Sequence, residues 1–193
     1  MGYSTNFIGN FKITLPQDIK QIGINEIQKN FSKDLITISN NKDLFTISDN
    51  IIDVLNVEQS LLLVNGLAKT RRMGRNMDSF FGVEGEFYFD TSDFDNFGQS
   101  KDNTVIDSNK PPKTQPELWL QWIVNYNEQT NEYTLEWDQG EKFYGYIEWL
   151  EYLIKNIFEP KNILLNGSVN WEGEDRDDVG TITIVNNTIT IDS

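Results

Sequence analysis

The stretch Trp137–Phe158, WDQGEKFYGYIEWLEYLIKNIF, decides the fold, because it is the clearest helical pattern in the sequence and the densest in aromatic residues. Asp138 precedes Glu141 by three residues, as in a capping box, and Pro160 ends the segment. We therefore expect a helix that begins near Asp138 and packs against a sheet. Its apolar side chains recur at spacings of three and four residues, which places them on one helix face: Phe143, Tyr146, Ile147, Leu150, Leu153, Ile154 and Ile157.

The composition indicates a globular protein and limits its chemistry. Of the 193 residues, 38% are hydrophobic and 12% aromatic, which is enough for a real core. The chain has no cysteine and no histidine, which excludes disulfides, a thiol nucleophile, thiolate metal sites and a histidine-dependent triad. No apolar run approaches about 18 residues, and the first residues lack the pattern of a signal peptide. We expect a soluble cytoplasmic protein with no membrane association.

The charge is strongly negative and unevenly placed. The net charge is −14, and residues 117–193 carry 15 acidic and 4 basic residues, against 15 and 12 in residues 1–116. Such a charge opposes direct nucleic-acid binding and fits partners that are themselves basic.

The first third of the chain predicts a strand, an insertion and a helix. Two sets of side chains alternate over residues 7–14, as in a strand ended by Pro16: Phe7, Gly9, Phe11 and Ile13 against Ile8, Asn10, Lys12 and Thr14. Residues 17–31 hold a weak helical pattern. The repeat of KDLITIS and KDLFTIS over residues 33–48 predicts a hairpin, inside a probable insertion over 16–56. Asn56 is placed to cap a helix that ends near residues 73–74.

The rest of the chain predicts strands, hairpins and a long polar loop over 91–117. Turn residues join two pairs of strands, at 127–131 and at Asn186-Asn187, and an acidic loop spans 172–180. The sum is the α+β class, a mainly antiparallel sheet with two principal helices packed on one face, in a single domain over 1–193. The predicted strands are 83–90, 118–126, 132–137, 163–171, 181–185 and 188–191.

Several motifs carry a resemblance to a known family. They are TRRM from Thr70, GVEGE from Gly82, VIDxNxPP from Val105, LWxxW from Leu118, EWDxGEKFY from Glu136, EWLEYLI from Glu148 and LNGxVxWxGED from Leu165. With these, the chain resembles a family of small uncharacterised proteins of phages and bacteria, over residues 1–15 and about 58–190. The resemblance supplies no catalytic residues. It implies a phage or mobile-element setting, in which small acidic proteins often bind host components or signalling ligands.

An arginine cluster is the first candidate site. Arg71, Arg72 and Arg75 are three of the four arginines in the chain. The guanidinium group binds phosphate or carboxylate with two hydrogen bonds, so the cluster could hold an anion. The alternative is a cationic helix end paired with the acidic half of the chain.

A loop and two tryptophans could complete that site. Lys101 and Lys110 lie in the loop 99–116, and Trp119 and Trp149 could stack on a base. Trp149 lies beside the apolar stripe, so we expect a partly exposed edge there. The alternatives are a loop pinned by its prolines and tryptophans that pack in the core.

Carboxylate pairs are a weaker signal. Glu136 and Asp138, or Glu148 and Glu151, could divide acid and base roles or hold magnesium. Chance pairing in an acidic chain is the alternative, and the acidic residues 172–178 fit a solvated turn better than a calcium loop. The sequence predicts no cofactor and no metal site.

These observations favour a non-enzymatic binding protein for an anionic small ligand, plausibly a nucleotide, held by the arginine cluster. The first alternative is an acidic interaction or inhibitor protein that engages a basic host partner or mimics nucleic acid. The second is a carboxylate-based hydrolase.

Overall fold

The structure, a computed structural model, describes residues 2–17, 56–69, 79–81, 87–89, 98–99, 115–117 and 119–193. The chain forms two compact units. The sheet unit consists of Met1–Gln21 and Trp119–Ser193, and the inserted unit of Ile22–Leu118. The prediction of a single domain with an insertion over 16–56 stays a prediction. The helical pattern over 17–31 and the repeat hairpin over 33–48 lie outside the described residues.

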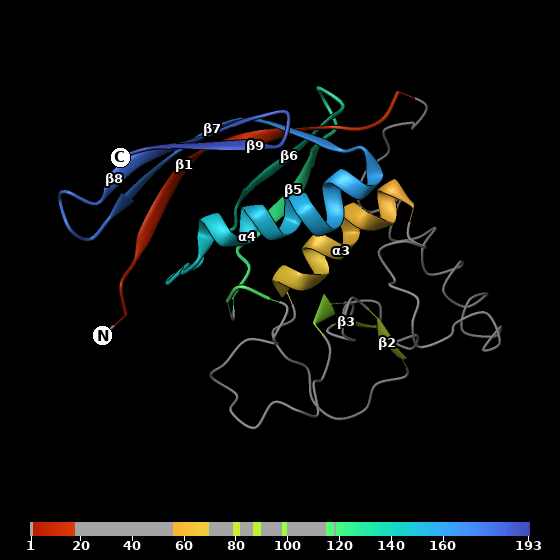
Figure 1. Cartoon of the computed structure of the whole chain (residues 1–193), viewed down its shortest axis with the longest axis horizontal. Helices are drawn as coiled ribbons and strands as arrows, with labels where there is room; N and C mark the ends of the chain where they lie inside the picture. Colours follow the sequence, from red (N-terminus) through yellow and green to blue (C-terminus); the bar gives the residue numbers. More distant parts are fainter. Residues whose placement is uncertain are drawn as a thin grey trace. The chain divides into compact units, whose positions relative to one another are not determined.

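The sheet unit is built on six antiparallel strands in the order β5-β6-β1-β7-β8-β9 (Figure 1). Although β1 comes first in the chain, it is an interior strand, paired with β6 on one side and with β7 on the other. The alternating pattern over 7–14 correctly predicts β1. The strands are β1 Thr5–Thr14, β5 Trp122–Asn127, β6 Glu132–Trp137, β7 Leu164–Gly173, β8 Val179–Val185 and β9 Thr188–Asp192.

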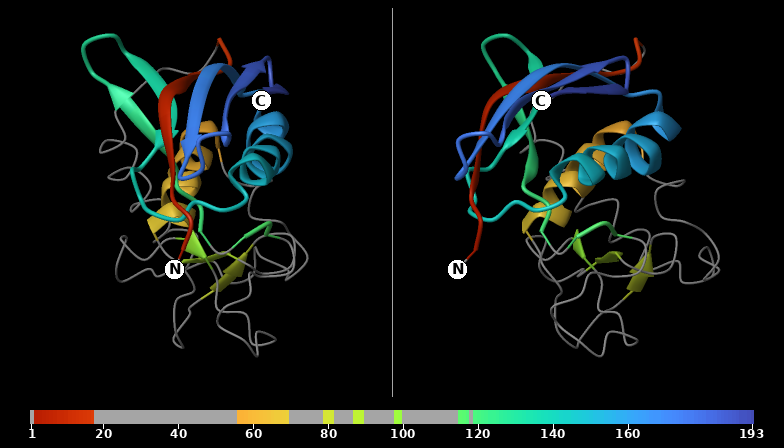
Figure 2. Two further views of the ribbon diagram at one scale, coloured as in Figure 1. Left: turned by 90° about the vertical axis from the view of Figure 1, so that its left-hand side faces the viewer. Right: turned by 60° about the vertical axis from the view of Figure 1, so that its left-hand side comes forward.

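Two glycines let β1 and β7 approach and bend together (Figure 2). Gly9 has φ 115° and Gly167 has φ 144°, backbone conformations that residues with a side chain rarely adopt. A Cβ atom at Gly9 would lie 2.5 Å from the carbonyl oxygen of Ser168, and one at Gly167 would lie 2.6 Å from that of Asn10. The curvature of the sheet therefore depends on having glycine, which has no side chain, at positions 9 and 167.

An aromatic cluster around Phe7 joins the inner face of the sheet to helix α4, Tyr146–Leu153. The ring of Phe7 makes edge-on contacts with Trp122 at 5.3 Å and with Tyr146 at 4.9 Å between centroids. Trp122 is fully buried, and its indole Nε1 donates to the carbonyl oxygen of Tyr146 at 2.9 Å. Trp137 and Phe143 pack against the same ring, at 5.5 and 5.8 Å. Such contacts add to the burial of the rings.

The helix begins later than the sequence predicts. Gly145, in the left-handed conformation with φ 62°, is the N-cap of α4, so the prediction of a capping box at Asp138 is wrong. The Asp138 carboxylate instead accepts from the amide of Gly140 at 2.8 Å, and this local turn competes with the helix. Gln139 and Lys142 also have positive φ, which continues the irregular path up to Gly145.

The helix continues beyond α4 in tighter and wider turns. Ile154–Phe158 forms a π-helical turn and Glu159–Lys161 a 3₁₀ turn that contains Pro160, before Asn162 ends the segment with φ 54°. The predicted apolar stripe is buried at Leu150, Ile154 and Ile157. Among the described residues, no helix is long and apolar enough to cross a membrane.

The inserted unit contains helix α3 and a three-stranded antiparallel sheet in the order β2-β3-β4. Helix α3 begins directly after Asn56, as predicted, and the carbonyl oxygen of Asn56 accepts from the amide of Ser60 at 3.0 Å. The mainly antiparallel α+β architecture is confirmed, whereas the packing of both helices on one face stays a prediction. The elements are α3 Val57–Lys69, β2 Ser79–Phe81, β3 Phe87–Phe89 and β4 Gly98–Gln99.

Candidate functional site

The outer face of the sheet, opposite α4, carries polar side chains. Among the described residues of the sheet unit, no helix lies over this face (Figure 2). Its side chains bond across the strands: Thr181 Oγ1 donates to Asn170 Oδ1 at 2.8 Å, and the hydroxyls of Ser168 and Thr183 are 3.4 Å apart. Cross-strand pairs of this kind hold a sheet face in a fixed arrangement.

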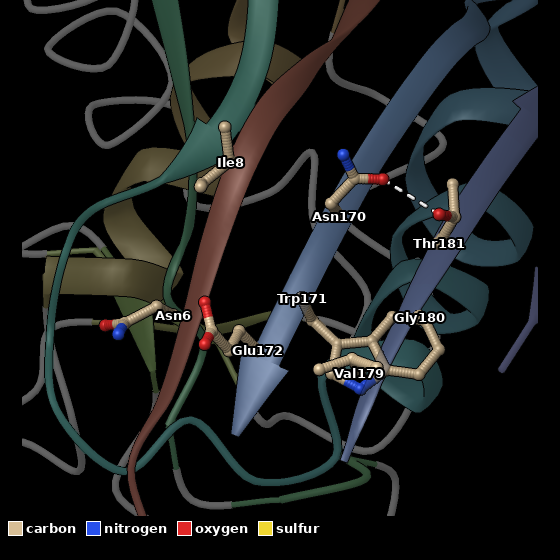
Figure 3. A pocket seen from close by; sticks show the side chains of 8 residues that line it. All are labelled: Asn6, Ile8, Asn170, Trp171, Glu172, Val179, Gly180 and Thr181. Atoms are coloured by element: carbon tan, nitrogen blue, oxygen red, sulfur yellow. Dashed lines mark hydrogen bonds between the residues drawn. The ribbon is translucent and has the colours of Figure 1, made fainter. Parts of the chain in front are cut away.

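A hollow of about 340 Å³ opens on this face across β1, β7 and β8 (Figure 3). The strand register arranges its lining in two rows, Ile8–Asn170–Thr181 and Asn6–Glu172–Val179. Ile8 is 70% exposed and Val179 46% exposed. Ile8 and Val179 thus present apolar side chains to solvent beside the polar residues Asn170, Glu172 and Thr181.

Trp171 and Gly180 lie between the two rows and connect the hollow to the core. The Trp171 side chain is buried and contacts Tyr146 of α4, with the ring centroids 6.1 Å apart. A Cβ atom at Gly180 would lie 2.1 Å from the Trp171 ring, so glycine is needed there. The indole Nε1 of Trp171 donates to Asp178 Oδ1 at 3.0 Å. The same tryptophan therefore supports the hollow and holds the turn that follows β7.

That turn, Glu174–Asp178, which we call the acidic turn, is attached to residues near the start of β1. The hydroxyl of Tyr3 donates to Asp178 Oδ2 at 2.6 Å and accepts from the amide of Asp175 at 3.1 Å. The amide of Ser4 donates to Glu174 Oε1 at 2.9 Å. The acidic turn is therefore fixed at several points.

These hydrogen bonds shift the titration of the groups involved. The Tyr3 hydroxyl, and after it the Trp171 indole, lowers the pKa of Asp178 because both donate to the ionised carboxylate. The same bond to Asp178 raises the pKa of Tyr3. Burial, followed by the charge of Asp178, raises the pKa of Tyr146 to about 12. Asp178 is thus a structural carboxylate that stays ionised at neutral pH.

Other carboxylates at this end of the sheet face solvent. Glu172, Asp175 and Asp177 are exposed, and no ion pair involves them within the part of the chain that the structure describes. An apolar wall beside a carboxylate suits a lysine or arginine side chain, whose stem is apolar and whose head is charged.

Within the described ranges, no three acidic side chains are grouped so that they could hold a metal ion.

Of the seven residues that the sequence predicts as an anion site, the structure describes two, and the site stays a prediction. Arg71, Arg72, Arg75, Lys101 and Lys110 lie outside the described residues. Two predicted tryptophans are described. Trp119, before β5, is 38% exposed, whereas Trp149 in α4 is 0% exposed. The expectation of an exposed edge at Trp149 is therefore wrong, because that side of α4 is buried as well.

The predicted carboxylate pairs have separate roles. Glu136 lies on the outer face, where Asn125 Nδ2 donates to it. Asp138 caps the local turn at Gly140, and burial raises its pKa more than this bond lowers it. Glu148 and Glu151 are exposed on α4.

The hollow was missed, although one signal for it is present in the sequence. Ile8 is an apolar residue in the polar register of β1, alternating with the buried residues Phe7 and Phe11. Val179 belongs to the outer set of β8 in the same way, opposite Glu172. That the two share a site depends on the pairing of β1, β7 and β8, which no local pattern reveals. No family model, curated protein or solved structure matches this chain.

Proposed function

We propose that this protein is a non-enzymatic binding module for a basic protein partner, in keeping with the phage setting that the sequence resemblance implies. The observation that carries the proposal is the hollow, in which exposed Ile8 and Val179 flank the carboxylate of Glu172. A hollow that binds a small molecule is usually more enclosed. An open hollow with one carboxylate, that of Glu172, fits a basic side chain presented by another protein.

Recognition combines a local contact with a long-range field. The aliphatic stem of a lysine or arginine packs between Ile8 and Val179, and its charged head reaches Glu172 and the amide oxygen of Asn170. The net charge of −14 accelerates the approach of a basic partner and repels nucleic acid. In this proposal the acidic turn attracts the partner and the hollow selects it. The module acts in the cytoplasm, without binding membranes or cofactors.

A peptide of alternating lysine and glycine tests this proposal, because glycine disfavours strand pairing and the peptide reports the charge and the hollow alone. We expect Glu172→Gln to weaken binding about tenfold and Val179→Ser to weaken it several-fold, as for a close charged contact. Glu128→Gln, at an exposed position in the β5–β6 turn, makes the same charge change and should weaken binding less than about twofold. Equal losses in the two glutamine variants, or no binding at low salt, would refute the hollow as the site.

The arginine cluster supports a second candidate function. Arg71, Arg72 and Arg75 gather most of the arginine of an acidic chain into five residues, which favours an anionic small ligand such as a nucleotide. A thermal-shift screen with nucleotides and cyclic dinucleotides tests it. Stabilisation that disappears in Arg71→Ala and Arg72→Ala supports this candidate, and the absence of any shift with every anion rejects it.

A further inference from the structure

Strand β9 is an edge strand of the six-stranded sheet: it pairs with β8 on one side and, among the described residues, with no strand on the other. All of its residues except Ile189 are exposed. An open edge offers a row of unpaired backbone groups with which another chain can pair. Natural proteins usually defend such edges with lysine, proline or a bulge, whereas β9 reads TITID and its single charge is Asp192.

The turn before β9 determines which backbone groups face the open edge. Asn186 and Asn187 have φ 46° and 69°, as in a two-residue hairpin turn. In such a hairpin the flanking residues, Val185 and Thr188, form a hydrogen-bonded pair, and the pairs then alternate. The backbones of Thr188, Thr190 and Asp192 are therefore directed to β8. The N–H and C=O groups of Ile189 and Ile191 are directed to the open edge.

The edge is held in place by its turn. Asn187 Oδ1 accepts from the amide of Leu165 at 2.7 Å, and Asn187 Nδ2 donates to the carbonyl oxygen of Ile163 at 3.0 Å. The amide of Asn187 also donates to the carbonyl oxygen of Leu165 at 3.2 Å. The hairpin is thus attached to β7 by both backbone and side chain. A pre-ordered edge loses little conformational entropy when a strand is added.

The side chains and charges along β9 determine which kind of strand can pair with this edge. Ile191 is opposite buried Ile182 and so lies on the inner side of the sheet, yet it is 46% exposed, so an added strand that places an apolar residue beside it would bury both. Asp192 pairs with Thr181, close to the acidic turn from which β8 emerges. That end of the edge is negative. A second copy of this chain would bring its own charge of −14 and be repelled.

We propose that β9 receives an extended segment of the basic partner as an added strand, one that alternates apolar and polar residues and carries lysine or arginine at the end beside Asp192. The inference rests on the proposed function, because it describes how the same partner is held. Backbone hydrogen bonds to Ile189 and Ile191 supply affinity, and Asp192 and the acidic turn fix the direction of the strand.

A synthetic peptide of about ten residues tests the inference, with valine and threonine alternating and two lysines at one end. On binding, the amides of Ile189 and Ile191 should become protected from hydrogen exchange, whereas those of Thr188 and Thr190 are protected already. Ile191→Pro removes an edge donor and leaves the bonds to β8 intact, so we expect at least about tenfold weaker binding. Ile191→Val keeps the donor and the shape and should bind like the unmodified protein.

Peptide variants keep the test decisive if Ile191→Pro fails to fold. N-methylation of alternate peptide residues blocks pairing without touching the protein, and it should abolish binding. Replacing the lysines by glutamates should weaken binding about tenfold. Equal binding of the N-methylated peptide, or no new protection at Ile189 and Ile191, overturns strand addition. Dimerisation of the protein that Ile191→Pro abolishes would overturn it as well, in favour of a second copy at this edge.

Different outcomes refute the basic-partner function and the strand addition at β9. If Glu172→Gln weakens the lysine-glycine peptide while the alternating peptide protects no β9 amide, the basic-partner function stands and strand addition falls. If neither basic peptide binds at low salt, the proposed function itself falls.

Discussion

The two faces of the six-stranded sheet are made by the same strands and have opposite characters. On the inner face, Phe7, Trp122 and Tyr146 pack edge to face and join the sheet to α4. On the outer face, one residue further along β1, Ile8 is 70% exposed beside Asn170. The difference shows that one strand can supply the core and expose a second set of side chains, since successive side chains point to opposite faces.

Mutations on the two faces should also have different consequences. Changes on the inner face should unfold the protein, whereas changes on the outer face should alter binding and leave the fold intact. Variants on the two faces should therefore differ in their effect on stability, from several kcal/mol to almost none.

The largest effect is expected for Trp122→Ala. Removing a fully buried indole, together with its hydrogen bond to the Tyr146 carbonyl, should lower the free energy of unfolding by about 3–5 kcal/mol. Urea denaturation followed by circular dichroism measures it. Asn125→Ala, on the outer side of the same strand, should change it by about 0.5 kcal/mol or less. Comparable losses in both variants would contradict the division between the faces.

Gly9→Ala tests the bend that both faces share. The added methyl group would lie 2.5 Å from a carbonyl oxygen, at a φ of 115°, so we expect a loss of about 1–3 kcal/mol. Asn10→Ala, at the next position, is the control and should be close to neutral. An unchanged denaturation midpoint for Gly9→Ala would mean that β1 and β7 can pair without the bend.

Asp178→Asn should weaken the attachment of the acidic turn, with a loss of about 2–4 °C in melting temperature at neutral pH. The folded state lowers the pKa of Asp178 below its ordinary 3.8. Its contribution is therefore complete above that value and is lost as the pH falls through the lower, folded-state pKa. Melting curves of the variant should lose this acid dependence, whereas those of Asp177→Asn should retain it.

Tyr146 gives the corresponding prediction at alkaline pH. Its pKa is raised from 10.0 to about 12, so the folded state favours the neutral phenol, and that contribution is lost as the pH rises through this range. Phenolate absorbance should show a late-titrating component that becomes smaller in Tyr146→Phe. Titration of all tyrosines together near 10 would contradict its burial.

The smallest effect on stability belongs to Ile8→Ser. An exposed side chain contributes little to folding, so the free energy of unfolding should stay within about 0.5 kcal/mol. Binding of the lysine-glycine peptide should nevertheless fall several-fold. A large stability loss without any loss of binding would reverse the roles assigned to the two faces.

Local patterns predicted the elements better than the site. The alternation over 7–14 predicts β1, and Asn186-Asn187 predicts the last hairpin, because both depend on neighbouring residues. The start of α4 was misplaced because Asp138 caps a turn at Gly140 as readily as it would cap a helix. The hollow depends on Ile8 facing Asn170, and that register is set by packing between residues far apart in the sequence.

The interior position of β1 has a consequence for how the protein folds. Lys12 pairs with Glu132, 120 residues later, and the pairing with β7 spans still longer separations. Closing such loops costs entropy before any contact forms, so folding of the sheet unit should be slow for its size. During synthesis, β1 stays unpaired until the whole inserted unit and β6 have emerged. In that period its apolar side chains are exposed, so chaperone binding would be most useful then.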